Sequence, residues 1–144
     1  MDGYGCMEKA KASQINPITL AFLGDAVYSL YVRQKLVVSG TGKAADFQRA
    51  ASKIVSAKGQ SAFLERVLPV LTEEETEIYR RGRNAKKPTK SKSASAAEYS
   101  RSTGFEAVLG YLHLIGEQAR IQTLLAMIDD TELQGVALEK VYKP

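Results

Sequence analysis

Several kinds of residue and segment are scarce or missing in this chain of 144 residues. Its one cysteine, Cys6, excludes an intramolecular disulfide framework and a cysteine-rich zinc site, which fits a reducing compartment. No apolar run reaches the roughly 18 residues of a membrane-spanning helix, and residues 1–14 lack the apolar core of a signal peptide. We therefore expect a cytoplasmic protein without contact to a membrane.

The composition that remains is that of an ordinary globular domain. Hydrophobic residues make up 44% of the chain and charged residues 25%, values typical of soluble proteins. This length suits one hydrophobic core, so we expect a single domain over residues 1–144. The net charge of +4 is only mildly basic, so the positions of the charges are more informative than their sum.

Helical patterns follow one another along the chain, and no segment alternates with the period of a strand. Asn16 before Pro17 is a favourable cap and first helical position, and predicts a helix to about residue 38. Its broad apolar side is typical of a central helix. Thr72 and Glu75 form a capping-box pattern that predicts a helix to about residue 83. Further helices are predicted over residues 43–68 with a break near 56, over 96–116 and over 117–128. The predicted fold class is all-α.

Two segments lack helical patterns. We expect a loose N-terminus over about residues 1–15 and a mobile basic loop over about residues 84–97, which is polar and contains Pro88. Between Arg80 and Lys92 the chain carries seven Lys or Arg residues and no acid. Such a run is often a solvated surface, but it also suits a polyanion, because arginines hold phosphates and lysines follow a charged backbone. The residues expected to contact nucleic acid are Arg80, Arg81, Arg83, Lys86, Lys87, Lys90 and Lys92, with Lys53, Lys58 and Arg101 extending the patch.

Two acids stand inside strongly apolar helical runs, Asp25 in LAFLGDAV and Glu106 in STGFEAVLGYLHL. We expect both to be buried, which is costly for an ionised carboxylate unless a cation meets it. Two carboxylates from two packed helices would suit Mg²⁺, which takes few protein oxygens and keeps several waters. The alternative is that each acid pairs with an arginine, for which Arg33 and Arg101 are available. Spacing alone favours the ion pairs and leaves both interpretations open.

Other motifs do not indicate a binding or catalytic site. GTGK at residues 40–43 lacks the spacing of a phosphate-binding loop, so we expect no nucleotide cofactor. His113 has no partner of a catalytic kind in the sequence, and the serines of SKSAS lack a histidine base.

Four segments in order resemble the catalytic domain of the ribonuclease III family. LAFLGDAVYSLYVR at residues 20–33 is similar to its signature helix, and FEAVLGYLHL at 105–114 to its partner helix. With KIVSAK at 53–58 and RRGRNAK at 80–86, they resemble most the Mini-III branch, which consists of the catalytic domain alone. Two family carboxylates are replaced here by Ala21 and Thr103, and the Mini-III branch shares this reduced set.

The resemblance implies a ribonuclease III helical fold and a homodimer that cuts both strands of double-stranded RNA. It implies a role in maturing precursor ribosomal RNA, notably the large-subunit RNA. It further implies that Asp25 and Glu106 are catalytic and bind Mg²⁺, or Mn²⁺ in its place. From their charge, we expect the basic residues named above to hold the duplex without a separate RNA-binding domain.

Two other functions stay open at this point. One is a module of the same fold that binds double-stranded RNA or assists ribosome assembly without cutting, because two family carboxylates are missing. The other is a helical protein–protein adaptor, for which we expect neither metal dependence nor salt-dependent RNA binding.

Overall fold

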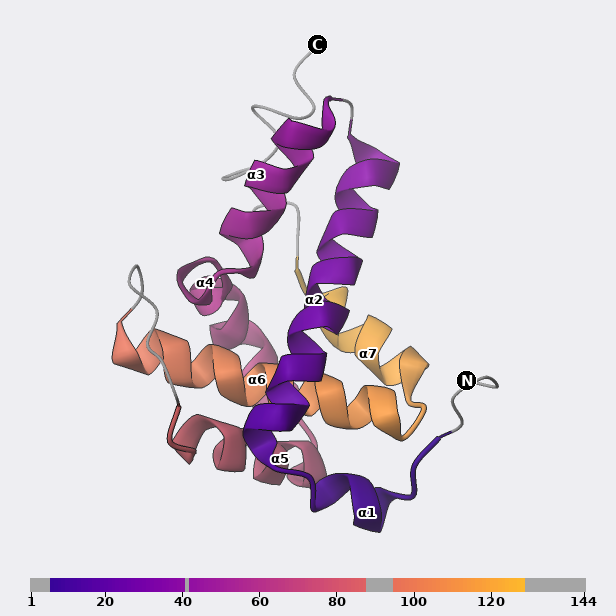
Figure 1. The fold of residues 1–144 in the computed structure, drawn as a ribbon, viewed down its shortest axis with the longest axis vertical. Helices are drawn as coiled ribbons and strands as arrows, with labels where there is room; N and C mark the ends of the chain where they lie inside the picture. Colours follow the sequence, from indigo (N-terminus) through magenta and orange to yellow (C-terminus); the bar gives the residue numbers. More distant parts are fainter. Residues whose placement is uncertain (1–5, 41, 88–94, 129–144) are drawn as a thin grey trace.

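The computed structural model describes residues 6–40, 42–87 and 95–128, which form helices and their connections (Figure 1). The helices are α1 (Lys9–Ser13), α2 (Pro17–Ser39), α3 (Ala44–Val55), α4 (Ala57–Val67), the 3₁₀ helix η1 (Leu68–Val70), α5 (Glu73–Asn84), α6 (Ala96–Leu114) and α7 (Gln118–Leu125). No strand occurs in these ranges, and the predicted all-α class is confirmed. None of the described helices is long and apolar enough to cross a membrane.

Capping residues set several helix boundaries as the sequence predicts. The Asn16 side chain accepts a hydrogen bond from the backbone N–H of Ile18, and α2 starts at Pro17. Thr72 and Glu75 form the predicted capping box at the start of α5. The predicted break near residue 56 is confirmed, because Ser56 separates α3 from α4 and caps α4.

Helix α6 lies at the centre of the molecule, with α2 crossing it and α5 beside it (Figure 1). Every α6 residue from 102 to 112 is buried except Glu106, which is partly buried. A helix covered on all sides needs no one-sided apolar pattern, and this explains the nearly continuous apolar run in the sequence.

Helix α2 is less buried than the sequence predicts. Leu20 and Leu36 lie in the core, but Phe22 is 81% exposed, Leu30 66% and Val38 77%. The expectation of a central helix is wrong for α2 because α6 takes that place, and α2 covers only one side of it.

Three aromatic rings join α2, α4 and α6 beneath the crossing. Tyr28, Phe63 and Phe105 are fully buried, and their ring centroids are 5.5 to 6.2 Å apart. Two of the three pairs meet edge to face, which is a favourable arrangement of aromatic rings. This cluster fixes the relative positions of the three helices that surround the candidate site.

Two glycines allow α2 and α6 to approach at backbone distance. A Cβ atom on Gly24 would lie 1.7 Å from the carbonyl oxygen of Glu106, and one on Gly110 would lie 2.0 Å from that of Leu20. Any side chain at either position would push the helices apart. The crossing therefore brings Asp25, the neighbour of Gly24, to the α6 turn that carries Glu106.

The N-terminal segment is more ordered than expected wherever the structure describes it. The N–H of Met7 donates to the carbonyl of Leu114 at 2.8 Å, and Ala12 of α1 is fully buried. The expectation of a loose segment over residues 1–15 is therefore wrong for residues 7–15. Of the predicted basic loop over 84–97, both ends belong to α5 and α6, and residues 88–94 lie outside the described ranges.

Candidate active site

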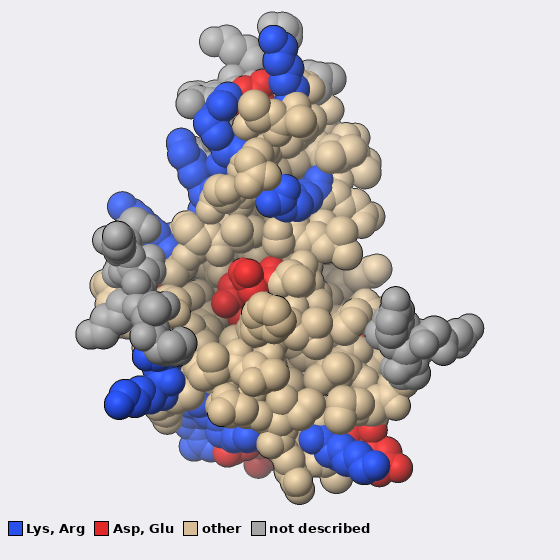
Figure 2. Space-filling model, in the orientation of Figure 1, with Lys and Arg blue, Asp and Glu red and all other residues tan. Residues whose placement is uncertain are grey.

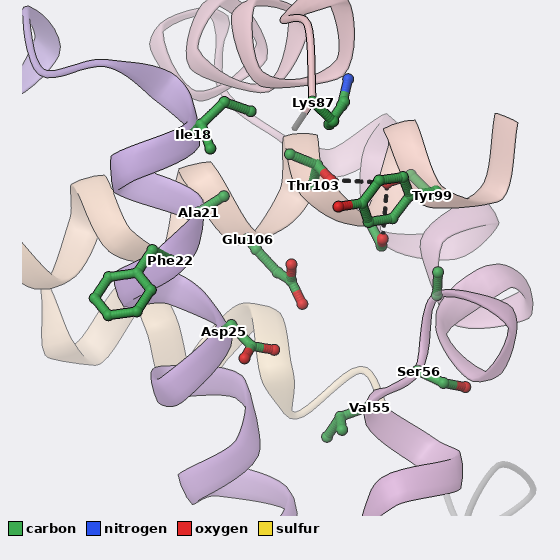
Figure 3. A pocket seen from close by; sticks show the side chains of 12 residues that line it. Ile18, Ala21, Phe22, Asp25, Val55, Ser56, Lys87, Tyr99, Thr103 and Glu106 are labelled. Atoms are coloured by element: carbon green, nitrogen blue, oxygen red, sulfur yellow. Dashed lines mark hydrogen bonds between the residues drawn. The ribbon is translucent and has the colours of Figure 1, made fainter. Parts of the chain in front are cut away.

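Asp25 and Glu106 share a pocket of about 380 Å³ between α2, α6 and the turn that joins α3 to α4. Figure 3 shows both carboxylates directed into the same space, Asp25 from α2 and Glu106 from α6. The sequence predicts that these acids lie on two different packed helices, and the structure brings them together.

The two acids differ in burial. Glu106 is partly buried at the base of the pocket, while Asp25 is exposed in the single chain. The expectation that Asp25 is buried is wrong, because the apolar residues around it, such as Phe22, are themselves on the surface.

The surroundings of Glu106 disfavour its charged form. Burial raises the pKa of Glu106, and the Asp25 carboxylate raises it further, to about 8. A hydrogen bond from Gln60 opposes this rise in part. The pair therefore holds a proton near neutral pH, and a bound cation would replace that proton.

Gln60 on α4 is a polar residue of the site that the sequence analysis missed. Its side chain is fully buried, and its Nε2 atom donates to Glu106 Oε2 at 3.1 Å and to the Val55 carbonyl at 2.9 Å. Its Oε1 atom is buried and finds no hydrogen-bond partner in the described part of the chain, which typically costs about 1–3 kcal/mol. Its burial could not be predicted from the sequence, because a glutamine among polar and apolar residues is typical of a surface position.

The arginine alternative finds no support in the described part of the chain. Arg33 donates to Ser29 and Gln48, both at 2.9 Å, and Arg101 donates to Ser61 at 3.1 Å. No ion pair between described residues joins either arginine to Asp25 or Glu106. The two acids therefore face each other with no cation from the described residues between them.

The donor set fits a hard divalent cation that keeps much of its water. Among the described residues no group of three or more His, Cys, Asp or Glu side chains is arranged to hold a metal ion, so the described part of this pocket offers two carboxylates. Ala21 and Thr103 line the same pocket, and the Thr103 hydroxyl donates to the Tyr99 carbonyl of its own helix. Mg²⁺ commonly binds through one or two carboxylates, with water and phosphate oxygens as its other ligands.

Lys87 is the predicted nucleic-acid contact that lies at the pocket itself (Figure 3). Its ammonium group donates to the Arg83 carbonyl, and burial lowers the pKa of Lys87. Arg83 stands over the ring of Tyr79, with 5.6 Å between its guanidinium carbon and the ring centroid. Both cations are thus held near the end of α5, on the side of the pocket where α6 begins.

The other predicted basic residues that the structure describes do not line this pocket. Lys53, Lys58 and Lys86 are exposed, and Arg80 forms an exposed ion pair with Glu77. Lys90 and Lys92 lie outside the described residues.

Arg81 has internal partners. Its guanidinium donates to the carbonyls of Ser13 and Ile15, so it ties α5 to the end of α1. This leaves it less available to a ligand than its place in the sequence indicates.

On one face of the molecule, a group of acidic side chains lies apart from the basic side chains. Figure 2 shows a small group of acidic side chains in a hollow near the middle of one face, surrounded by uncharged surface. Lys and Arg side chains gather above this hollow and along the left edge of the view. Such a face would meet a polyanion with cations at the rim and carboxylates at the centre.

Known proteins of one family are similar to this chain. The ribonuclease III domain family matches residues 18–117. The Mini-ribonuclease 3 of Symbiobacterium thermophilum is 44% identical over 124 residues, covering 86% of this chain and 95% of that protein. The Mini-ribonuclease 3 of Streptococcus pneumoniae is 48% identical, covering 78% and 89%.

A solved structure shows the same fold. The crystal structure of protein FN1578 from Fusobacterium nucleatum superposes with a TM-score of 0.73 at 27% identity, over 83% of this chain and 95% of that one. The resemblance read from the four sequence segments is thereby confirmed. This chain belongs to the ribonuclease III family, among relatives named Mini-ribonuclease 3.

Proposed function

We propose that this protein is a Mg²⁺-dependent endoribonuclease that cleaves double-stranded RNA, and that Asp25 and Glu106 are its catalytic, metal-binding residues. The observation that carries the proposal is the meeting of these carboxylates in one pocket of a ribonuclease III domain, with no protein cation between them among the described residues. Mn²⁺ is an alternative ion, because it prefers the same oxygen ligands.

The two acids have different tasks in this proposal. Glu106 is held from below by Gln60, while Asp25 stands at the mouth of the pocket, where water and a phosphate group can reach it. Glu106 releases its proton when a cation is present, because positive charge lowers the pKa of a neighbouring carboxyl. A bound Mg²⁺ would supply activation of the attacking water and stabilisation of the charge that develops on the phosphate.

The duplex is held by shape and charge. A-form RNA presents phosphates and 2′-hydroxyls in its shallow minor groove, and such contacts carry little sequence information. Lys87 at the pocket and the exposed Lys53, Lys58 and Lys86 are the described cations best placed to reach phosphates.

A second copy of the chain covers the exposed side of α2 in this proposal. Phe22, Ala26 and Leu30 follow one another at four-residue spacing, so they form an apolar stripe along α2 beside Asp25. A homodimer would bury this stripe and present two sites, one for each RNA strand. Light scattering should give twice the chain mass of 15.7 kDa, and Leu30→Glu should give the monomer. A wild-type monomer at working concentrations would contradict the homodimer.

The proposed cellular substrate is precursor ribosomal RNA, notably that of the large subunit, with the cytoplasm as the location. This part of the proposal rests on the similarity to the Mini-III branch.

Cleavage of a labelled long RNA duplex tests the proposed reaction. We expect cutting with Mg²⁺ or Mn²⁺ and none with EDTA, while single-stranded RNA and duplex DNA remain intact. Tight duplex binding without cutting under any metal or salt condition would instead indicate a non-catalytic RNA-binding module.

A further inference from the structure

Gln60 is a buried polar residue at a position where packing of the fold does not require a polar side chain. Its side chain has no exposed surface, and both N–H groups of its amide are in use, one on the Val55 carbonyl and one on Glu106 Oε2. The amide oxygen is buried and has no hydrogen-bond partner among the residues that the structure describes. A methionine of similar size would fill the same space without an unpaired polar atom, so packing alone does not account for a glutamine here.

The orientation of the amide is fixed by its neighbours. If the amide were reversed, Oε1 would face the Val55 carbonyl oxygen, which can only accept a hydrogen bond. The donors therefore point toward Glu106. They engage its Oε2 atom and leave the other carboxylate oxygen for the pocket and Asp25.

The segment before Gln60 is tightly packed and hydrogen-bonded. The Ser56 hydroxyl donates to the Lys53 carbonyl at 2.8 Å and accepts from the N–H of Gly59 at 3.0 Å. A Cβ atom on Gly59 would lie 2.0 Å from that same carbonyl, so the end of α3 and the start of α4 are in backbone contact. This tight turn delivers Gln60 to Glu106 in one position.

We propose that Gln60 is a positioning residue: its amide fixes which oxygen of Glu106 faces the pocket, and thereby sets the affinity of the Asp25–Glu106 pair for a divalent cation. The inference rests on the proposed function, because it assigns the cation to that pair. Groups that orient a metal-binding side chain commonly change metal affinity about 10- to 100-fold when they are replaced.

The test compares Gln60→Met with Gln48→Met, a matched change at an exposed glutamine of α3. Mn²⁺ binding to the full chain is measured by calorimetry without RNA, together with thermal unfolding and duplex binding in EDTA. We expect about tenfold weaker Mn²⁺ binding or more for Gln60→Met, with folding and metal-free RNA binding retained. Gln48→Met should match the wild type. A folded Gln60→Met variant with wild-type Mn²⁺ affinity would overturn the inference.

A measurement on the unaltered protein covers the case in which Gln60→Met does not fold. The side-chain amide resonances of Gln60 should shift during a Mg²⁺ titration, with the same midpoint as the backbone amide of Glu106. Gln60 resonances that stay in place while those of Glu106 move would overturn the role of Gln60 alone. A wild type that neither binds Mn²⁺ nor cuts duplex RNA would overturn both this inference and the proposed function.

Discussion

At the scale of single residues, Asp25 and Glu106 are similar acids in unlike surroundings. The sequence identifies both, because each is a lone carboxylate in an apolar helical run beside glycine. It does not reveal that Asp25 is exposed, nor that Gln60 lies against Glu106, because both facts depend on how helices distant in sequence pack. A charged residue in an apolar run can be recognised in the sequence, whereas the side chains that contact it cannot.

Glu106→Gln should make the metal-free protein more stable at alkaline pH. The pKa of Glu106 is about 8 in the folded chain, against 4.5 for the ordinary carboxyl, so the unfolded chain loses its proton first as pH rises. Stability from this group therefore falls between about pH 5 and 8, and the amide variant escapes that loss. We expect its melting temperature in EDTA to exceed that of the wild type by about 5 °C at pH 8.5, with little difference at pH 5.

The control for this change is Glu65→Gln on the exposed side of α4. It should leave the melting temperature unchanged at both pH values. Equal melting temperatures of Glu106→Gln and the wild type at pH 8.5 would show that the surroundings of Glu106 do not disfavour its charged form.

At the scale of elements, local capping chemistry determines the helix boundaries, while tertiary packing determines which faces are buried. The starts of α2, α4 and α5 follow from Asn16, Ser56 and Thr72, whose side chains accept backbone hydrogen bonds within the same turn. Helix α1 and the exposure of Phe22 could not be predicted in this way. The first depends on Leu114 far along the chain, and the second on α6 taking the centre.

Gly24→Ala should separate α2 from α6 and destabilise the protein. The added methyl would overlap the Glu106 carbonyl at 1.7 Å, and backbone on both sides leaves no flexible group to move aside. Overpacking of this kind typically costs about 1–3 kcal/mol, and we expect about 3 kcal/mol in the free energy of unfolding, measured with urea. Cleavage should also be impaired, since the two carboxylates would move apart.

Ala62→Ser, on the exposed side of α4 and away from the apolar stripe on α2, is the control and should change the free energy of unfolding by less than about 0.5 kcal/mol. A Gly24→Ala protein as stable and as active as the wild type would mean that the close crossing is not needed to assemble the site.

At the scale of the whole molecule, the fold class and the family can be read from motifs, because four segments occur in the order typical of that family. The apolar stripe on α2 shows why the pattern of one chain misleads about burial. In the proposed homodimer α2 would contact both its own core and a second copy, so its sequence has the breadth of a central helix although Phe22, Leu30 and Val38 are exposed in the single chain.

Neutralising the basic loop should weaken duplex binding and flatten its salt dependence. Each phosphate contact contributes about 0.7 to 0.9 to the slope of log affinity against log salt, so replacing Lys86, Lys87, Lys90 and Lys92 by Gln should lower its magnitude by up to about three. Filter binding over a range of salt concentrations measures this slope. Lys9→Gln with Lys11→Gln on α1 should behave as the wild type, and an unchanged slope for the loop variant would show that the loop does not contact RNA.

The central claim is that Asp25 and Glu106 act together on duplex RNA, and Asp25→Asn tests it most directly. Asn keeps the size of the side chain and removes its charge, so binding and chemistry can be separated. The measurement is cleavage and binding of one labelled RNA duplex in Mg²⁺ by the wild type and by Asp25→Asn at matched folding. We expect Asp25→Asn to bind the duplex as the wild type does and no longer to cut it. Equal cutting by both proteins would mean that Asp25 is not needed for the reaction and would place the reaction elsewhere in the molecule.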